Sequence, residues 1–291
     1  MYPSRFGYEA PKTVEEAIAI LDAHGGEAKI LAGGQSLVPM MKLRFAAPEM
    51  IVDINNINGL DYHRVDPDGS IHIGALCRHE DLEKSEVIAK SQPTIAAAAP
   101  LVSDPIVRTR GTFVGSVCHA DPQGDWAAAM TALGGHMVVQ GPKGTRDISM
   151  KDFVIGPFQN TLAFNEIAIE AVIPAPKGVA RGGYLKLERR VGDFATASVA
   201  VSLDMVGDTV ARVGIALAGV GGRTIDATEA ASSLNGKKLT AENISQVAAA
   251  VAAVAEPRTD HRGSADYKRQ IVKTFVERIL TSLATPSQKA A

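Results

Sequence analysis

The sequence has few of the residue types that build several common kinds of site. Its two cysteines, Cys77 and Cys118, cannot by themselves supply a four-thiolate zinc or iron–sulfur site. Aromatic residues make up only 5% of the 291 residues, so each aromatic side chain near a candidate site carries more weight. The net charge is -2 and no long basic run is present, which argues against nucleic-acid binding.

Several other signals are missing. No apolar run approaches the length that spans a membrane, and the first residues lack the apolar core of a signal peptide. We therefore predict a soluble protein of the cytoplasm, or one held peripherally at the inner face of the membrane. The sequence also lacks a serine motif of the G-x-S-x-G kind, and no lysine of the Walker type follows either of its glycine-rich stretches, residues 33–36 and 111–116. These absences argue against a hydrolase and a kinase.

A glycine-rich stretch follows the apolar run at residues 28–32. Gly33 and Gly34 come first, then Gln35 and Ser36, before an apolar segment resumes. Glycine permits the turn and lets a ligand approach the main chain, and Ser36 can cap a helix or bond an anion. Alone, the stretch is more typical of a plain strand–turn–helix connection. A second stretch of similar character, residues 111–116, favours a paired binding site for a phosphate or pyrophosphate.

The first part of the chain reads as an α/β arrangement. Residues 13–16 form a capping pattern before an apolar helix that ends near residue 25. Strands at 28–32 and 50–54 predict a small βαβ-like unit. The further predictions are hairpins over 62–75 and 136–148, helices over 78–83, 88–102 and 125–133, and a strand over 166–173.

The proline-rich segment 174–178 is the best candidate for a linker. After it we predict strands at 184–190, 197–206 and 210–220 and helices at 225–234, 240–255 and 265–283. The fold class is therefore α+β. The predicted first domain spans residues 1–176, with two α/β subdomains split near residue 57; a smaller domain spans 177–285, and 286–291 form a tail.

A few polar and aromatic residues stand out as candidates for chemistry. His119, Asp121 and Asp125 lie close in sequence, but helix caps use such residues more often than metal ions do, and we predict no metal. Asp125 at a helix start could instead bond a ribose hydroxyl. Lys186 could be a solvent-facing strand residue, and Phe194 could be a core residue or a platform for a ring system.

These residues together resemble a known family. Residues 32–37, with Lys42-Leu43-Arg44 and Val52-Asp53-Ile54, are similar to the first FAD motif in the medium subunits of molybdenum hydroxylases, the carbon monoxide dehydrogenase and xanthine dehydrogenase family. Residues 110–116 resemble its second motif, and 119–125 and 192–197 match further along. The resemblance covers essentially the whole chain, and it implies an FAD-binding domain followed by a smaller domain with a three-stranded antiparallel sheet and packed helices.

The resemblance also implies roles for individual residues. Both glycine motifs would hold the FAD pyrophosphate, Asp125 would meet the ribose, and Phe194 would cover one face of the flavin near Ile167 and Lys186. No residue is expected to act as a general acid or base. The implied FAD-binding residues are Ile30, Leu31, Ala32, Gly33, Gly34, Gln35, Ser36, Leu37, Val102, Gly111, Thr112, Val114, Gly115, Ser116, His119, Ala120, Asp121, Asp125, Ile167, Lys186 and Phe194.

The sequence departs from the family pattern at a few of these positions. Val114 replaces a glycine and Ser116 an asparagine; a side chain at position 114 is expected to crowd the phosphate and weaken FAD binding. Phe194 stands where tyrosine or tryptophan is frequent. Gln35 replaces the histidine of carbon monoxide dehydrogenases, which makes carbon monoxide a less favoured substrate of the assembly.

The resemblance implies an electron-transfer subunit of a heteromeric enzyme. FAD would take electrons from [2Fe–2S] clusters on a small partner subunit, while the substrate is oxidised at molybdopterin on a large partner subunit, in a dimer of heterotrimers. The external acceptor would be a quinone, NAD or oxygen. Two alternatives are a cofactor-free interaction subunit of the same fold, which Val114 keeps open, and a free-standing flavin oxidase, for which only His119 is available near the motifs.

Overall fold

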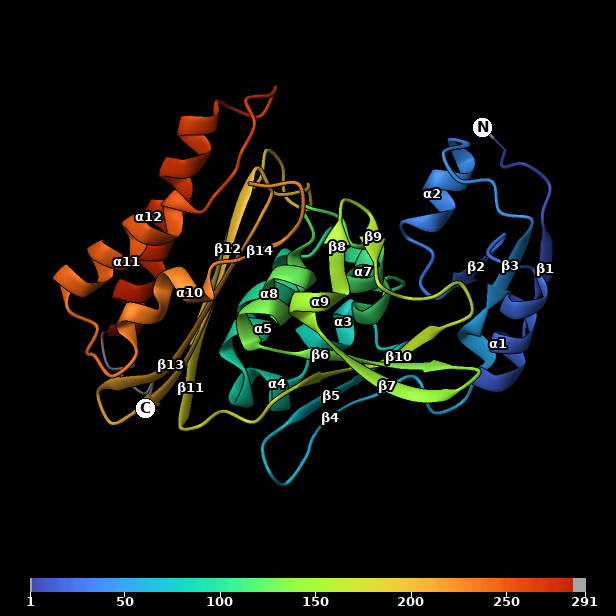
Figure 1. Ribbon diagram of the computed structural model, residues 1–291, viewed down its shortest axis with the longest axis horizontal. Helices are drawn as coiled ribbons and strands as arrows, with labels where there is room; N and C mark the ends of the chain where they lie inside the picture. Colours follow the sequence, from blue (N-terminus) through green and yellow to red (C-terminus); the bar gives the residue numbers. More distant parts are fainter. Residues whose placement is uncertain (1, 285–291) are drawn as a thin grey trace.

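The computed structural model describes residues 2–284 and contains three main sheets that follow one another along the molecule (Figure 1). The N-terminal sheet lies at one end, and the last helices of the chain lie at the other. The tail predicted at residues 286–291 lies outside the described residues. Within the described part of the chain, no helix is both long and apolar enough to cross a membrane.

The first sheet has three parallel strands in the order β1-β3-β2. The predicted βαβ-like unit is present as β2, α2 and β3. Strand β1 was not predicted, because a three-residue strand with one polar and one glycine position carries no periodic signal. The elements are β1 (Gly7–Glu9), α1 (Val14–Ala23), β2 (Ala28–Leu31), α2 (Leu37–Lys42), β3 (Met50–Asp53) and η1 (Ile54–Asn56).

The central part is a five-stranded antiparallel sheet in the order β4-β5-β10-β6-β7, covered by helices. Both predicted hairpins are found in it. Its elements are β4 (His63–Val65), β5 (Ile71–Gly74), α3 (His79–Glu83), α4 (Glu86–Ser91), α5 (Pro93–Ala98), η2 (Ala99–Leu101), α6 (Pro105–Arg108), α7 (Phe113–His119), α8 (Asp125–Leu133), β6 (His136–Gly141), β7 (Gly144–Ser149), α9 (Met150–Phe153), β8 (Val154–Gly156), β9 (Gln159–Asn160) and β10 (Ile167–Ile173).

The single helix predicted over 88–102 is wrong, because the structure divides this segment. Helix α4 ends at Ser91, and α5 starts at Pro93. Gln92 between them has φ -140 and ψ 86, since a proline disfavours helical backbone in the residue before it. The break turns the chain so that α5 can pack against the C-terminal domain.

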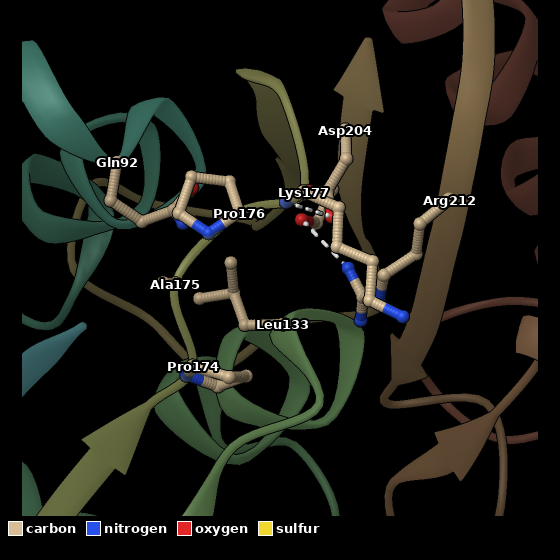
Figure 2. A pocket seen from close by; sticks show the side chains of 9 residues that line it. Gln92, Leu133, Pro174, Ala175, Pro176, Lys177, Asp204 and Arg212 are labelled. Atoms are coloured by element: carbon tan, nitrogen blue, oxygen red, sulfur yellow. Dashed lines mark hydrogen bonds between the residues drawn. The ribbon is translucent and has the colours of Figure 1, made fainter. Parts of the chain in front are cut away.

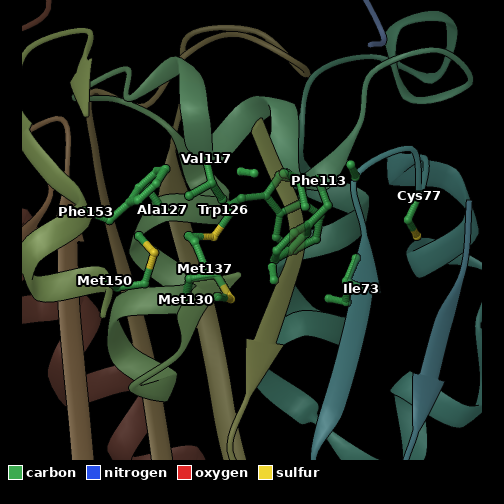
Figure 3. Packing of buried hydrophobic residues seen from close by; sticks show 14 of the residues in the cluster. Ile73, Cys77, Phe113, Val117, Trp126, Ala127, Met130, Met137, Met150 and Phe153 are labelled. Atoms are coloured by element: carbon green, nitrogen blue, oxygen red, sulfur yellow. The ribbon is translucent and has the colours of Figure 1, made fainter. Parts of the chain in front are cut away.

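The core of this part lies between the helices and the sheet (Figure 3). Phe113 from α7 and Trp126 from α8 are fully buried, with ring centroids 4.7 Å apart. Met130, Met137 and other apolar side chains fill the space around them. The apolar faces of α7 and α8 therefore hold both helices in place. The same packing positions the N-terminal ends of these helices.

The C-terminal part is a four-stranded antiparallel sheet, β11-β12-β13-β14, followed by helices. The three predicted strands are confirmed, but the helix predicted at 225–234 is wrong over its first residues, which pair with the edge of β13 instead. Its elements are β11 (Val179–Leu187), β12 (Ala197–Val206), β13 (Thr209–Ala218), β14 (Ile225–Asp226), α10 (Thr228–Ala231), η3 (Ser232–Leu234), α11 (Ala241–Ala253) and α12 (Ala265–Ala284).

This sheet is covered on both faces. Helices α11 and α12 cover one face, and α5 and α8 of the preceding part cover the other (Figure 1). Alternate residues of β12 follow this division: Val199 and Val201 belong to the core beneath α11 and α12, while Ala200 belongs to the core around α8. Small side chains on that face let α8 lie close to the sheet, so that the start of α8 meets β11.

Candidate cofactor-binding site

The first glycine loop joins the end of β2 to the start of α2. In the described residues, the main-chain amides of Gly33, Gly34, Gln35 and Ser36 donate to no oxygen of the protein. Gly34 has φ +73, a conformation that favours glycine. Ser36 is the N-cap of α2 but makes no capping bond with its side chain, so the loop presents unused donors to a ligand.

The second glycine loop leads into α7. Thr112 caps this helix, since its side-chain oxygen accepts from the amide of Gly115 at 3.2 Å. Across residues 2–284, the amides of Thr112 and Val114 find no acceptor. Gly115 and Ser116 are only partly buried, at the surface end of the loop.

The expected crowding by Val114 is not what the structure shows. Its side chain is 2% exposed and belongs to the hydrophobic core, while its amide is among the unused donors of the loop. In a helix the side chain and the amide of one residue point in different directions. A valine can therefore replace glycine at this position without covering the face that carries the amides.

The two glycine loops touch. A Cβ atom on Gly33 would lie 2.3 Å from the carbonyl oxygen of Arg110 and 2.7 Å from Cα of Gly111. A Cβ atom on Gly111 would lie 2.7 Å from Nε2 of His79. Both positions thus require glycine because the two main chains and the His79 ring lie so close together. The loops are far apart in sequence, and their contact brings unused amides of both loops close together.

Two residues that sequence reasoning missed hold this contact together. Arg78 donates from Nη1 to the carbonyl of Arg110 at 2.6 Å and from Nη2 to Oδ1 of Asn55 at 2.7 Å. Asn55 in turn donates from Nδ2 to the carbonyl of Ala32 at 2.8 Å. Neither residue lies in a glycine motif, so only their spatial position identifies them.

His79 supports the second loop from below. Its Nδ1 accepts from the indole nitrogen of Trp126 at 2.9 Å, which places the proton of the neutral ring on Nε2. Burial lowers the pKa of His79 to about 4, and Arg108 and Arg78 act in the same direction. The ring is therefore neutral at physiological pH, and it packs against Gly111 as a rigid wall.

The end of α7 carries three predicted residues: His119, Ala120 and Asp121. Ala120 adopts a left-handed conformation with φ 52, and the His119 ring lies 5.1 Å from that of Phe158. Burial lowers the pKa of His119, and Asp121 opposes the shift. Asp121 accepts from the amide of Gln123 at 2.9 Å, a local turn bond. Within residues 2–284, no group of three His, Cys, Asp or Glu residues is arranged to hold a metal ion.

Asp125 and Lys186 meet each other where α8 crosses β11. Asp125 accepts from the hydroxyl of Tyr184 at 2.5 Å and from Nζ of Lys186 at 3.0 Å, and Lys186 also donates to the carbonyl of Leu101 at 2.8 Å. The Lys186 side chain is only 2% exposed. Burial raises the pKa of Asp125, and Lys186 opposes this. In this structure both residues use their polar atoms to join the two parts of the protein.

Three other predicted residues lie around this junction or beyond it. Val102 follows η2 and is buried, and Ile167 is the buried first residue of β10. Phe194 is 52% exposed on the connection between β11 and β12. Its carbonyl accepts from Arg262, and that of Ala195 from Gln123 at 3.1 Å. The backbone of this connection is thus fixed while the Phe194 ring is free to cover a flat ligand.

A separate pocket lies beside the proline-rich segment 174–178 (Figure 2). Within it, the amide of Lys177 donates to Asp204 at 3.0 Å, and Arg212 donates to Ser202 at 3.4 Å. None of the predicted cofactor-binding residues is among those that line it. The lining residues are Gln92, Leu133, Pro174, Ala175, Pro176, Lys177, Ser202, Asp204 and Arg212.

Comparison with known proteins places this geometry in a family. Residues 4–176 match the family described as "FAD binding domain in molybdopterin dehydrogenase", and residues 183–283 match "CO dehydrogenase flavoprotein C-terminal domain". The chain belongs to this family of FAD-binding medium subunits of molybdenum hydroxylases. It is therefore an oxidoreductase subunit, and its cofactor is FAD.

Similar individual proteins cover nearly the whole chain. The carbon monoxide dehydrogenase medium chain of Hydrogenophaga pseudoflava is 41% identical over 97% of this chain and 98% of its own length. The glyceraldehyde dehydrogenase medium chain of Sulfolobus acidocaldarius is 33% identical over 98% and 100%. A solved carbon monoxide dehydrogenase structure from H. pseudoflava, which lacks the Mo-pyranopterin moiety, superposes with a TM-score of 0.92, at 42% identity and covering 97% of this chain and 98% of that one.

Proposed function

We propose that this chain is the FAD-carrying electron-transfer subunit of a heteromeric molybdenum hydroxylase. The observation that supports it best is the contact between the two glycine loops, which brings together main-chain amides that have no acceptor in the described residues. Main-chain donors of this kind hold phosphate groups without a lysine. The residues present thus fit the pyrophosphate of FAD.

The position of each residue supports the role that the proposal gives it. The amides of both glycine loops bind the pyrophosphate, and the hydroxyl of Ser36 offers a further donor. The exposed ring of Phe194 covers one face of the flavin. Asp125 accepts from the ribose, since Tyr184 and Lys186 use one lone pair on each of its two oxygens. Bound FAD supplies the redox chemistry, and the protein supplies binding, orientation and electrostatic tuning.

The wider assembly is part of the same proposal. A small subunit with [2Fe–2S] clusters delivers the electrons, and a large subunit with molybdopterin oxidises the substrate, in a dimer of heterotrimers located in the cytoplasm. The substrate is then determined by the large subunit, in keeping with relatives named for carbon monoxide and for glyceraldehyde. We further propose that the FAD-binding domain spans residues 1–176, split near residue 57, and that the second domain spans 177–285.

Two measurements test the proposal. The full chain, reconstituted with FAD and freed of excess, is expected to be yellow and to hold about one FAD per chain. Co-expressed with the two partner subunits, it is expected to co-purify with them, and its flavin absorbance is expected to bleach with substrate only when the small subunit is present. A chain that takes up no FAD, or that is bleached without the small subunit, contradicts the proposal.

The variant Val114→Gly separates this function from that of a cofactor-free subunit. Because the Val114 side chain lies in the core, its loss is expected to lower the free energy of unfolding by about 2–3 kcal/mol. FAD affinity is expected to change less than about threefold, since no phosphate surface is uncovered. A large gain in affinity from undetectable binding would favour a degenerate site.

A further inference from the structure

The two glycine loops could be positioned by the turns themselves or by side chains behind them. The donors that bond the carbonyl groups of the loops distinguish these two possibilities. The carbonyl of Ala32 accepts from Nδ2 of Asn55, and that of Arg110 accepts from Nη1 of Arg78. Both carbonyls are therefore held by side chains that come from outside the loops.

Holding the Ala32 carbonyl also fixes an amide. In a trans peptide the C=O and the following N–H point in opposite directions. Because Asn55 holds the carbonyl of Ala32, the N–H of Gly33 points to the other side, where it has no acceptor in the described chain. A donor fixed in this way is already oriented before an anion arrives, which reduces the entropy lost on binding.

The guanidinium of Arg78 connects the two loops. One arm reaches the carbonyl of Arg110 at 2.6 Å, and the other reaches Oδ1 of Asn55 at 2.7 Å. The fork of a guanidinium is planar and rigid, so it fixes the distance between its two acceptors, whereas a lysine offers a single point of charge. Arg78 is half-buried, and no carboxylate oxygen of residues 2–284 lies within 4.0 Å of its guanidinium nitrogens.

Both ends of this connection are themselves anchored. The amide of Arg78 donates to Asp81 at 3.0 Å, and the adjacent backbone pairs with the second loop, since the amide of His79 donates to Gly111 at 3.0 Å. On the other side, Oδ1 of Asp53 accepts from Nδ2 of Asn55 at 2.6 Å. The hydroxyl of Tyr8 on β1 donates to the same carboxylate at 2.7 Å.

We propose that Arg78 and Asn55 are positioning residues that hold the two glycine loops at the separation needed for pyrophosphate. The inference rests on the proposed FAD-binding function and adds two residues to it that no glycine motif contains. The bridge runs from the carbonyl of Ala32 through Asn55 and Arg78 to the carbonyl of Arg110. Its loss lets the loops separate and releases the orientation of the Gly33 amide.

The test compares FAD affinity and amide hydrogen exchange in the full chain stripped of flavin. Arg78→Met removes both arms and is expected to weaken FAD binding about 30-fold, because bonds to charged groups are strong. Arg78→Lys keeps the charge but reaches only one acceptor, and about tenfold weaker binding is expected. Arg146→Met is the control: Arg146 is more exposed than Arg78 but is also held through two guanidinium nitrogens, by Glu166, and less than a twofold change is expected.

Hydrogen exchange and a double variant add readouts that a general loss of stability would not reproduce. Peptides covering 30–37 and 110–116 are expected to exchange faster in Arg78→Met and unchanged in Arg146→Met. Asn55→Ala combined with Arg78→Met is expected to be no worse for FAD binding than the single variants, because both break one chain of bonds. If Arg78→Met does not fold, FAD affinity and hydrogen exchange are measured on Asn55→Ala alone.

The outcomes are distinguishable from a failure of the proposed function. The bridge is overturned if Arg78→Met binds FAD with an affinity within twofold of that of the unaltered chain. It is also overturned if the FAD affinity of Arg78→Lys equals that of the unaltered chain. Additive effects of the two substitutions overturn it as well. If the unaltered chain takes up no FAD, the proposed function fails, and the exchange of residues 30–37 alone then decides whether the bridge holds the loops.

Discussion

Two polar regions of this protein use their hydrogen-bonding groups in opposite ways. At the glycine loops, main-chain amides such as those of Gly33 and Gln35 have no acceptor within residues 2–284. Where α8 crosses β11, Asp125, Tyr184 and Lys186 satisfy one another and are almost completely buried. The first region is open to a ligand and the second is closed by its own partners. Unused donors at a surface thus indicate binding, and mutual satisfaction in the interior indicates assembly of the fold.

The largest effect is expected from a side chain introduced between the glycine loops. In Gly33→Ala the new Cβ would lie 2.3 Å from the carbonyl oxygen of Arg110, so the loops must move apart. FAD affinity is expected to fall about 100-fold or more, because the amides no longer converge. Gly222→Ala is the control, since a Cβ there meets nothing within 4 Å. Titration with FAD measures both, and equal affinities would remove the contact from the explanation.

The closed region is tested by removing its cation. Lys186→Met leaves the Asp125 carboxylate buried with Tyr184 alone, and the free energy of unfolding is expected to fall by about 3–5 kcal/mol. Denaturant unfolding measures the change. Lys84→Met is the control: its ion pair with Glu80 is exposed, and the expected loss is below about 0.5 kcal/mol.

The pH dependence of Lys186→Met has a predictable sign. Burial raises the pKa of Asp125, and loss of the lysine raises it further. A folded-state pKa above the unfolded value contributes stability at low pH that is lost as the pH rises through it. The deficit of the variant is therefore expected to shrink as the pH is lowered. A deficit that grows on acidification would show that Lys186 is not the partner that keeps Asp125 ionised.

His79 borders the glycine loops but is expected to titrate as a buried imidazole. Its pKa is lowered from 6.5 to about 4, mainly by burial. The unfolded chain binds this proton more tightly than the folded chain does. The contribution of neutral His79 to the free energy of unfolding is therefore complete above pH 6.5 and is lost as the pH falls through 4. This contribution amounts to about 3 kcal/mol. The difference in unfolding free energy between the unaltered chain and His79→Gln is expected to shrink by that amount from pH 7.5 to 4. A constant difference would mean that His79 is accessible.

The smallest effect is expected at the exposed aromatic ring. Phe194→Ala removes a side chain that is 52% exposed, so the free energy of unfolding is expected to change by less than about 0.5 kcal/mol. FAD affinity is expected to fall about tenfold if the ring stacks on the flavin. Phe164→Ala, at 53% exposure elsewhere, should leave FAD affinity unchanged. Equal affinities in both variants would exclude stacking by Phe194.

Much of the fold was predictable because its signals are local. The Thr13 cap, the strand before Gly33 and the hairpins are written in short patterns of apolar, turn and capping residues. Elements whose existence depends on partners were not predictable. β14 forms only because β13 offers it an edge, and β1 only because β3 does. The break at Gln92 was hidden by an apolar, alanine-rich run.

The sequence by itself determined the two glycine loops, the α+β class and the resemblance to the FAD-binding family. Only the tertiary structure decided how the loops meet, where the Val114 side chain lies, and that Arg78 and Asn55 hold the loops together. The reason is physical: a glycine motif records the local freedom of the backbone. A contact between residues 33 and 111, or a hydrogen bond between residues 55 and 78, depends on the packing of the segments that carry them.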